Sequence, residues 1–130
     1  MRHLFALPVL CATLAACAAP AAPRIAGTFT LERGARVEVA PGVTVAFEAV
    51  DDSRCPPGVQ CVWAGKLSYR FSIRRGSEAS ETFALSPAQP SAAPAVLGGR
   101  RIVLDVSAIP PAAAQGASIV YRATFTIAPA

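Results

Sequence analysis

The sequence predicts an all-β protein, a single antiparallel β-sandwich of about seven strands or a small barrel, preceded by a signal peptide. Three observations lead to this fold class. Apolar and polar residues alternate with a period of two in several short segments, Pro and Gly separate these segments, and no segment beyond the signal peptide has a helical period. A chain of 130 residues, 53% of them hydrophobic and 15% charged, has the length and balance of one folded domain.

The first half of the domain contains four of the predicted strands. Segment 27–31 is a short first strand, and segments 36–39 and 43–49 are separated by Pro41-Gly42, which predicts a turn. Segment 67–74 alternates most regularly, as a half-buried antiparallel strand does. The residues expected to face the core in these strands are Val37, Val39, Val43, Val45, Phe47, Ala49, Leu67, Tyr69, Phe71 and Ile73.

The second half contains three more predicted strands, at 82–85, 101–109 and 118–127. Between the first two, Ser86 to Gly99 is rich in Pro and Ala and is expected to be a long loop or a crossover at a sheet edge. Pro110-Pro111 ends the second of these strands. The expected core-facing residues are Phe83, Leu85, Ile102, Leu104, Val106, Ile119, Tyr121, Ala123, Phe125 and Ile127.

Residues 1–16 have the features of a signal peptide. A positive start, Met1-Arg2-His3, is followed by thirteen uncharged and mostly apolar residues, a length too short to span a bilayer. The segment ends in Leu14-Ala15-Ala16-Cys17, which resembles the lipobox of bacterial lipoproteins. That resemblance implies that Cys17 is lipidated and becomes the new N-terminus. The alternative is an ordinary secretory signal with an incidental Cys.

Residues 17–24 form a tether, and residues 25–130 form the β-domain. The Ala and Pro residues after Cys17 carry no charge and have no core of their own, as expected of a semi-extended spacer. Residue 18 is Ala, whereas Asp at this place resembles an inner-membrane retention signal of Gram-negative lipoproteins. The sequence therefore favours an outer-membrane lipoprotein that faces the periplasm and contacts the membrane through the lipid on Cys17.

The remaining cysteines predict one disulfide. Cys11 leaves with the signal peptide and Cys17 carries the lipid, so Cys55 and Cys61 are the only pair in the mature domain. Pro57-Gly58 between them suits the centre of a type II turn. A loop of this size gains about 2.4 kcal/mol from the bridge. The alternatives are a redox pair or a metal site, but the spacing is not Cys-x-x-Cys and no His is available nearby.

Residues 51–65 contain an unusual concentration of special residues. Asp52-Ser53-Arg54-Cys55-Pro56, followed by Cys61-Val62-Trp63-Ala64-Gly65, resembles a family of small uncharacterised bacterial lipoproteins and secreted proteins. The resemblance implies a secreted β-domain with a disulfide loop, and it implies no reaction. We interpret the segment as a structural corner of the fold. The alternative is a rigid binding loop that uses Arg54, Pro56, Pro57 and Trp63.

The composition of the mature chain argues against an enzyme. The only His is His3, so the mature domain has no imidazole and no free thiol, which excludes Ser-His-Asp and Cys-His systems and His-based zinc sites. We therefore predict no catalytic residue, no metal and no cofactor. The remaining enzymatic hypothesis is a hydrolase that uses the carboxylates Asp51, Asp52 and Asp105. Neighbours on an extended chain point in opposite directions, so Asp51 and Asp52 make a poor acid–base pair.

Basic residues suggest one further candidate surface. Lys66, Arg70 and Arg74 are expected on the outward face of one strand, where they could meet an anionic polymer or a lipid headgroup. The alternative is an ordinary solvated face. The net charge of +4 and the pI of about 9.2, without clustered Lys and Arg, argue against nucleic acid as a partner.

These observations support one leading functional hypothesis and one alternative. The leading hypothesis is a lipid-anchored protein of the cell envelope that serves as a non-catalytic binding or structural module, with an envelope protein or an anionic polymer as partner. The alternative is an inhibitor of an envelope or foreign protease that acts through the 55–61 loop, since a closed, Pro-rich loop loses little entropy on docking.

Overall fold

A computed structural model of the chain describes Cys17 and residues 26–128. The predicted signal peptide and all of the tether except Cys17 lie outside the described residues. Among the described residues, no helix is long and apolar enough to cross a bilayer.

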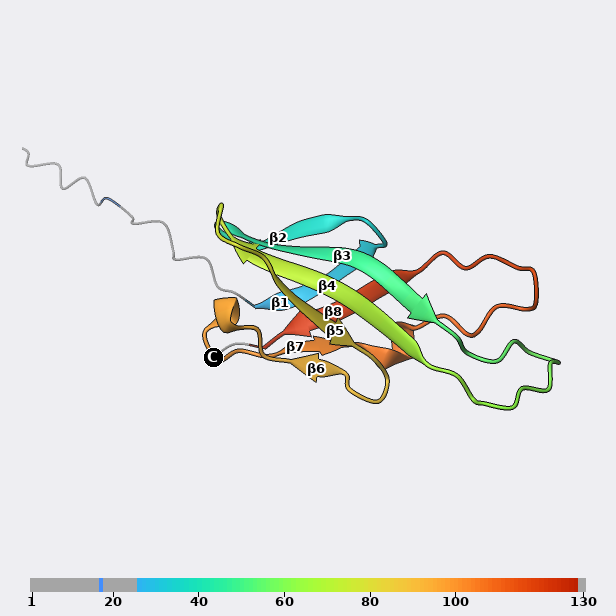
Figure 1. The fold of residues 1–130 in the computed structure, drawn as a ribbon. Helices are drawn as coiled ribbons and strands as arrows, with labels where there is room; N and C mark the ends of the chain where they lie inside the picture. The colour runs from blue at the N-terminus through green and yellow to red at the C-terminus, as the bar shows by residue number, and fades with distance from the viewer. Residues whose placement is uncertain (1–16, 18–25, 129–130) are drawn as a thin grey trace, which may run out of the picture.

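The domain is a β-sandwich of two antiparallel four-stranded sheets (Figure 1). One sheet has the order β1-β8-β7-β6 and the other the order β2-β3-β4-β5, and neither closes into a barrel. Short 3-10 helices η1 and η2 flank β7. In chain order the elements are β1 (Gly27–Glu32), β2 (Arg36–Ala40), β3 (Val43–Asp52), β4 (Leu67–Arg75), β5 (Glu81–Leu85), β6 (Ser91–Ala92), η1 (Ala95–Leu97), β7 (Ile102–Leu104), η2 (Val106–Ala108) and β8 (Arg122–Ile127). The predicted all-β sandwich is confirmed.

The core lies between the two sheets and is almost entirely apolar. Inward-facing aromatic residues from β3, β4 and β8 contact one another, with Phe47 stacked on Phe71 and Phe125 edge-on to Phe71. Most of the predicted core residues are buried: Val39, Val43, Val45, Phe47, Leu67, Tyr69, Phe71, Ile73, Leu85, Ile102, Leu104, Ala123, Phe125 and Ile127. All buried side chains of the described residues lie between Leu31 and Ile127, so this segment contains a complete core.

A β-bulge in β3 corrects the predicted orientation of Ala49. Phe47 pairs with Phe71, but the next two pairs are Ala49 with Arg70 and Val50 with Tyr69, so one residue is extra in β3. Because side chains alternate with period two, the extra residue exchanges the two faces of the strand beyond it. The prediction that Ala49 faces the core is therefore wrong.

The predicted strand 101–109 is shorter than expected. Strand β7 ends at Leu104, and Asp105 then caps η2 by accepting a hydrogen bond from the backbone N–H of Ser107. Val106, which was expected in the core, is 47% exposed. The predicted strand 118–127 also begins later, at Arg122, so that Ile119 lies in a loop.

The Pro- and Ala-rich segment from Ser86 to Gly99 contains more structure than a loop. The two-residue strand β6 pairs with β7, and η1 follows it. Leu97 in η1 is only 2% exposed and adds to the core. The sequence pattern missed Leu97 because no period-two alternation marks the segment around it.

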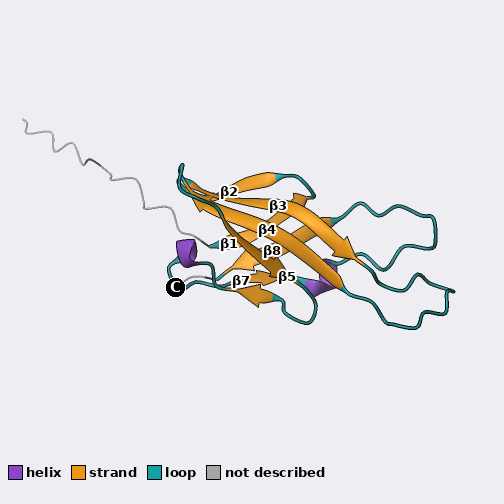
Figure 2. Cartoon of the chain, viewed as in Figure 1, coloured by secondary structure: helices purple, strands orange, loops and turns teal. Residues whose placement is uncertain are grey.

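Two long loops project from one end of the sandwich, and the chain enters at the other (Figure 2). We call residues 55–65 the disulfide loop and residues 109–121 the alanine-rich loop. Strand β1 begins at Gly27, which pairs with Ile127 at the end of β8. Both loops lie at the opposite end, which we call the loop end (Figure 1).

Candidate functional site

The base of the disulfide loop is closed by Ser53 and Lys66. The N–H of Ser53 donates to the carbonyl oxygen of Lys66 at 2.8 Å, and the N–H of Lys66 donates to Oγ of Ser53 at 2.9 Å. Gly65 makes this closure possible, because a Cβ atom there would lie 1.9 Å from the carbonyl oxygen of Ser53. Its φ of +73° also favours glycine. Ser53 and Gly65 of the motif therefore have structural roles.

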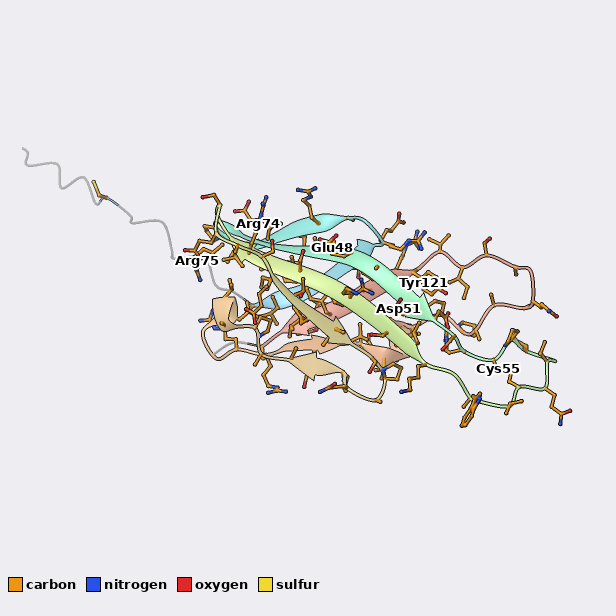
Figure 3. All side chains as sticks on the ribbon, in the orientation of Figure 1. Glu48, Asp51, Cys55, Arg74, Arg75 and Tyr121 are labelled. Carbon is orange, nitrogen blue, oxygen red and sulfur yellow. A yellow bond between two sulfur atoms is a disulfide. The ribbon has the colours of Figure 1, made fainter. Side chains whose placement is uncertain are left out.

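The tip of the disulfide loop is fixed by the predicted bridge. Cys55 and Cys61 form a disulfide with a Cα–Cα distance of 5.9 Å. Between them, the N–H of Val59 donates to the carbonyl oxygen of Pro56, and Gly58 has a φ of +75°, as the predicted type II turn requires. Both predictions are confirmed. Figure 3 shows Cys55 on the projecting loop, at the opposite end of the sheet from Arg74.

Asp52 and Arg54 join the disulfide loop to the alanine-rich loop. Because of the bulge, Asp52 lies opposite Leu67 on the inner face, where its side chain is 13% exposed. Arg54 donates from Nε to Oδ1 of Asp52 at 3.0 Å and from Nη2 to Oδ2 at 2.9 Å. Its Nη1 donates to the carbonyl oxygen of Pro110 at 2.8 Å, where the alanine-rich loop begins. At the other end of that loop, the hydroxyl of Tyr121 donates to Oδ2 of Asp52 at 2.6 Å.

We call these residues the Asp52–Arg54–Tyr121 clamp. It holds both ends of the alanine-rich loop against the start of the disulfide loop, so the two loops form one unit. Hydrogen bonds from Arg54 hold the pKa of Asp52 well below its usual range, and the same bonds raise the pKa of Arg54. Burial, followed by the hydrogen bond to Asp52, raises the pKa of Tyr121.

The clamp leaves Asp52 little capacity for proton transfer. Its two oxygens accept four hydrogen bonds, including one from the N–H of Arg54. Asp51 faces the other way and pairs with Arg70 on the outer surface at 2.9 Å. Asp105 accepts hydrogen bonds from Ser107 in η2. The three carboxylates of the hydrolase hypothesis thus have separate partners. Within residues 26–128, no three His, Cys, Asp or Glu side chains cluster as metal ligands.

The exposed parts of both loops carry no charge and are mostly apolar, with Gln60, Gln115 and Ser118 as exposed polar residues. Neither residues 55–65 nor residues 109–121 contain an Asp, Glu, Lys or Arg. The exposed fraction is 91% for Val62, 82% for Trp63 and 71% for Val120. The exposure of Trp63 favours the binding-loop interpretation for the tip, whereas Asp52, Ser53, Arg54 and Gly65 belong to the structural base of the loop.

A cleft of about 280 Å³ lies between the two loops. Asp52, Arg54 and Tyr121 contribute its polar groups, and Pro56 and the run from Ala112 to Ala117 contribute apolar surface. Two candidate residues of the binding loop therefore border this cleft, Arg54 and Pro56. Pro57, which was also predicted as a binding-loop residue, is exposed at the turn.

The basic residues Lys66, Arg70 and Arg74 do not form one cationic strip. Lys66 precedes β4 and lies at the base of the disulfide loop, and Arg70 is paired with Asp51. Arg74 borders a separate hollow of about 150 Å³, together with Arg36, Glu48 and Ser72. Glu48 accepts a hydrogen bond from the hydroxyl of Ser72, so charges of both signs occupy this face.

Sequence analysis missed the alanine-rich loop and its part in the clamp. It placed Tyr121 in a strand and gave Pro110 only the role of ending one. The available signal was the run of thirteen residues, 109–121, without a charge. Val120 is 71% exposed, so this loop also carries an exposed apolar side chain, as the disulfide loop does with Val62 and Trp63.

Comparison of the chain with protein-family models, with curated proteins and with solved structures finds no match.

Proposed function

We propose that the protein is a non-catalytic binding module of the bacterial cell envelope, anchored by a lipid on Cys17, and that it binds its partner through the two uncharged loops. The observation that carries the proposal is the 82% exposure of Trp63 on a loop whose base and tip are both fixed. Large apolar side chains on a fixed loop lose little conformational entropy on binding, and aromatic residues supply much of the energy of interfaces.

The position of the loops relative to the anchor supports this role. Eight residues, 18–25, separate Cys17 from Ala26, and the nine Cα-to-Cα steps between them give a maximum reach of about 30 Å. The chain enters the sandwich at the end opposite the loops (Figure 1). A domain held in this way keeps Val62, Trp63 and Val120 far from the point where the chain enters it, so that the tether does not cover them.

The chemistry of the described side chains supports a non-catalytic role. Asp52 is saturated by hydrogen bonds, and its lowered pKa keeps it ionised. Asp51 and Arg70 are exposed surface residues that neutralise each other. The residues of the motif thus serve to build and hold the loops.

Lipid anchoring is tested by mass spectrometry of the protein purified from a bacterial envelope. We expect an acylated Cys17 at the new N-terminus and a membrane-bound protein, and we expect Cys17→Ser to release the domain into the soluble fraction. An unacylated N-terminus, or a Cys17→Ser protein that stays with the membrane as wild type does, would contradict the anchor.

Binding through the loops is tested by site-specific photo-crosslinking in the envelope. A photoreactive residue in place of Trp63 should give a crosslinked product, with a protein or with a phospholipid. The same residue in place of Glu78, which is exposed in the turn between β4 and β5 at the far end, is the matched control. Equal crosslinking from both positions, or none from position 63, would contradict the proposal.

A second candidate function is inhibition of an envelope or foreign protease. The observation that favours it is the convex, disulfide-closed tip with Val62 and Trp63 exposed, because protease clefts accept rigid convex loops. We expect a sensitive protease to be slowed by micromolar wild-type protein and much less by Trp63→Ala. A panel of serine, cysteine and metalloproteases that is unaffected at this concentration would rule the candidate out.

A further inference from the structure

We propose that the partner of the two loops is the surface of a lipid bilayer that contains anionic phospholipids. This inference rests on the proposed use of the loops in binding. Val62, Trp63 and Val120 enter the interfacial region of the bilayer, and Lys66 and Arg33 approach the phosphates of the headgroups.

The absence of charge from the loops is the first argument. The eleven residues 55–65 and the thirteen residues 109–121 contain no charged side chain, although 15% of the whole chain is charged. Interfaces between proteins usually surround an apolar centre with a polar and charged rim. Here the uncharged surface extends from both tips to both loop bases, which suits insertion into an apolar medium.

The shape of the loop end is the second argument. The two loops project separately from the sandwich (Figure 2), and both carry a highly exposed apolar side chain, Val62 at 91% and Val120 at 71%. A protein partner would need matching hollows for both projections, whereas a bilayer surface adapts to any convex shape. Trp63 adds an amphipathic ring of the kind that prefers the headgroup level.

The positions of the basic residues are the third argument. Lys66 lies where the disulfide loop returns to β4, and the N–H of Arg33 donates to the carbonyl oxygen of Tyr121, where the alanine-rich loop joins β8. Among the described residues, neither side chain is within ion-pair distance of a carboxylate. Two other basic residues near the loops are neutralised, Arg54 by Asp52 and Arg122 by Glu32. Positive charge behind an apolar tip complements anionic headgroups.

The backbone limits how deep the loops enter. Most N–H and C=O groups of the tips have no regular partner in the sandwich, and such groups are costly in the hydrocarbon core. We therefore place the tips at the headgroup and acyl boundary, at a depth of about 5–10 Å.

The anchor and the loops can use the same membrane in one orientation. Strand β3 alone, with ten residues, is about 33 Å long, which already matches the longest reach of the tether. If the long axis of the sandwich stood perpendicular to the membrane with the loops inserted, the point where the chain enters the sandwich would lie beyond the reach of the tether. The sandwich must therefore tilt, with its long axis oblique to the membrane, so that the loop tips reach the bilayer while the entry point stays within reach of the tether.

The experiment uses residues 18–130, which lack the signal peptide and Cys17 but retain the complete core. Vesicles of phosphatidylglycerol and phosphatidylethanolamine are compared with vesicles of phosphatidylcholine. Trp63 is the only Trp of the chain, so its fluorescence reports on the loop directly. We expect a blue shift with anionic vesicles, quenching by lipids brominated near the headgroup, and binding that is at least about tenfold weaker to neutral vesicles or at high salt.

Matched variants separate the loops from the rest of the surface. Val120→Ser should weaken vesicle binding by about threefold to tenfold, whereas Val103→Ser, at a 40% exposed position on β7, should leave it unchanged. Lys66→Gln, which keeps the backbone hydrogen bonds to Ser53, should weaken it by about fivefold. An unshifted Trp63 spectrum with both kinds of vesicle, or equal losses in Val120→Ser and Val103→Ser, would overturn the inference.

The outcomes also distinguish this inference from the proposed function. Absence of vesicle binding, together with a crosslink from position 63 to a protein, overturns the lipid inference and leaves the binding module in place. Absence of vesicle binding together with slowing of a protease assigns the loops to inhibition. Vesicle binding by residues 18–130 supports the inference even if Cys17 proves to be unacylated.

Discussion

Replacing Asp52 by Asn should destabilise the domain by about 3 kcal/mol. Oδ2 of Asp52 accepts hydrogen bonds from Nη2 of Arg54 at 2.9 Å and from the hydroxyl of Tyr121 at 2.6 Å. An amide nitrogen in its place cannot accept either bond, and Arg54 is left without its partner. Hydrogen bonds to charged groups contribute about 1.5–3 kcal/mol each, and loss of one partner of a buried pair costs about 3–5 kcal/mol. We take the lower end because the pair lies near solvent, with side chains 13% and 21% exposed.

Thermal unfolding of residues 18–130, followed by far-ultraviolet circular dichroism, measures this loss. A change of about 3 kcal/mol corresponds to a decrease in Tm of about 15 °C for a domain of this size. Asp51→Asn is the matched control, since it removes the same charge from an exposed pair with Arg70 and should leave Tm nearly unchanged. Equal decreases in the two variants would refute the assignment of Asp52 to the inner face.

Wild type and Asp52→Asn also test how the stability of the domain depends on pH. The pKa of Asp52 is lowered from its ordinary value of 3.8 by the hydrogen bonds from Arg54, so ionisation favours the folded state. This contribution is complete above 3.8, where Asp52 is ionised in both states, and it is lost as the pH falls towards the lowered pKa of the folded state. The difference in Tm between wild type and Asp52→Asn should therefore be constant above about pH 5 and should shrink as the pH falls below about 4. A constant difference would contradict the ionic nature of the clamp.

Three further predictions concern other parts of the structure. Gly65→Ala should destabilise the domain far more than Gly58→Ala in urea unfolding, because both residues have positive φ but only Gly65 lies against backbone atoms, those of Ser53 and Arg54. Tyr121→Phe should lower stability by about 1–2 kcal/mol, whereas Tyr69→Phe should be neutral or stabilising, since the hydroxyl of Tyr69 has no partner among the described residues. Reduction of the disulfide should lower the free energy of unfolding by about 2 kcal/mol while far-ultraviolet dichroism of the folded domain persists.

The parts of the fold that follow from local periodicity could be predicted. Strand β4 alternates strictly from Leu67 to Ile73. This pattern fits a strand with one face in the core and the other in solvent, and β4 lies between β3 and β5 in this way. The bulge in β3 could not be predicted, because Ala49 and Val50 are both apolar and either could face inward. The end of β7 carried a usable signal, since Asp105 followed by Ser107 suits a helix cap.

Of the candidate site, only the disulfide and the turn that it closes could be predicted from the sequence. The bridge between Cys55 and Cys61 follows from counting cysteines, and the turn between them follows from Pro57-Gly58. The contact of Arg54 with Pro110 joins positions 56 residues apart and depends on how the two sheets pack, which no local pattern contains. The motif contains both structural and exposed residues. Only the packed structure shows that Gly65 lies against the backbone of Ser53 while Trp63 is exposed to solvent.

The bulge in β3 decides which of two adjacent aspartates, Asp51 or Asp52, faces the inside of the sandwich. With the extra residue present, Asp52 is opposite Leu67 and Asp51 is opposite Ser68. If the same sequence paired with β4 without the bulge, Asp51 instead of Asp52 would lie opposite Leu67. Two adjacent aspartates at the end of this strand thus keep a carboxylate on the inner face in either register.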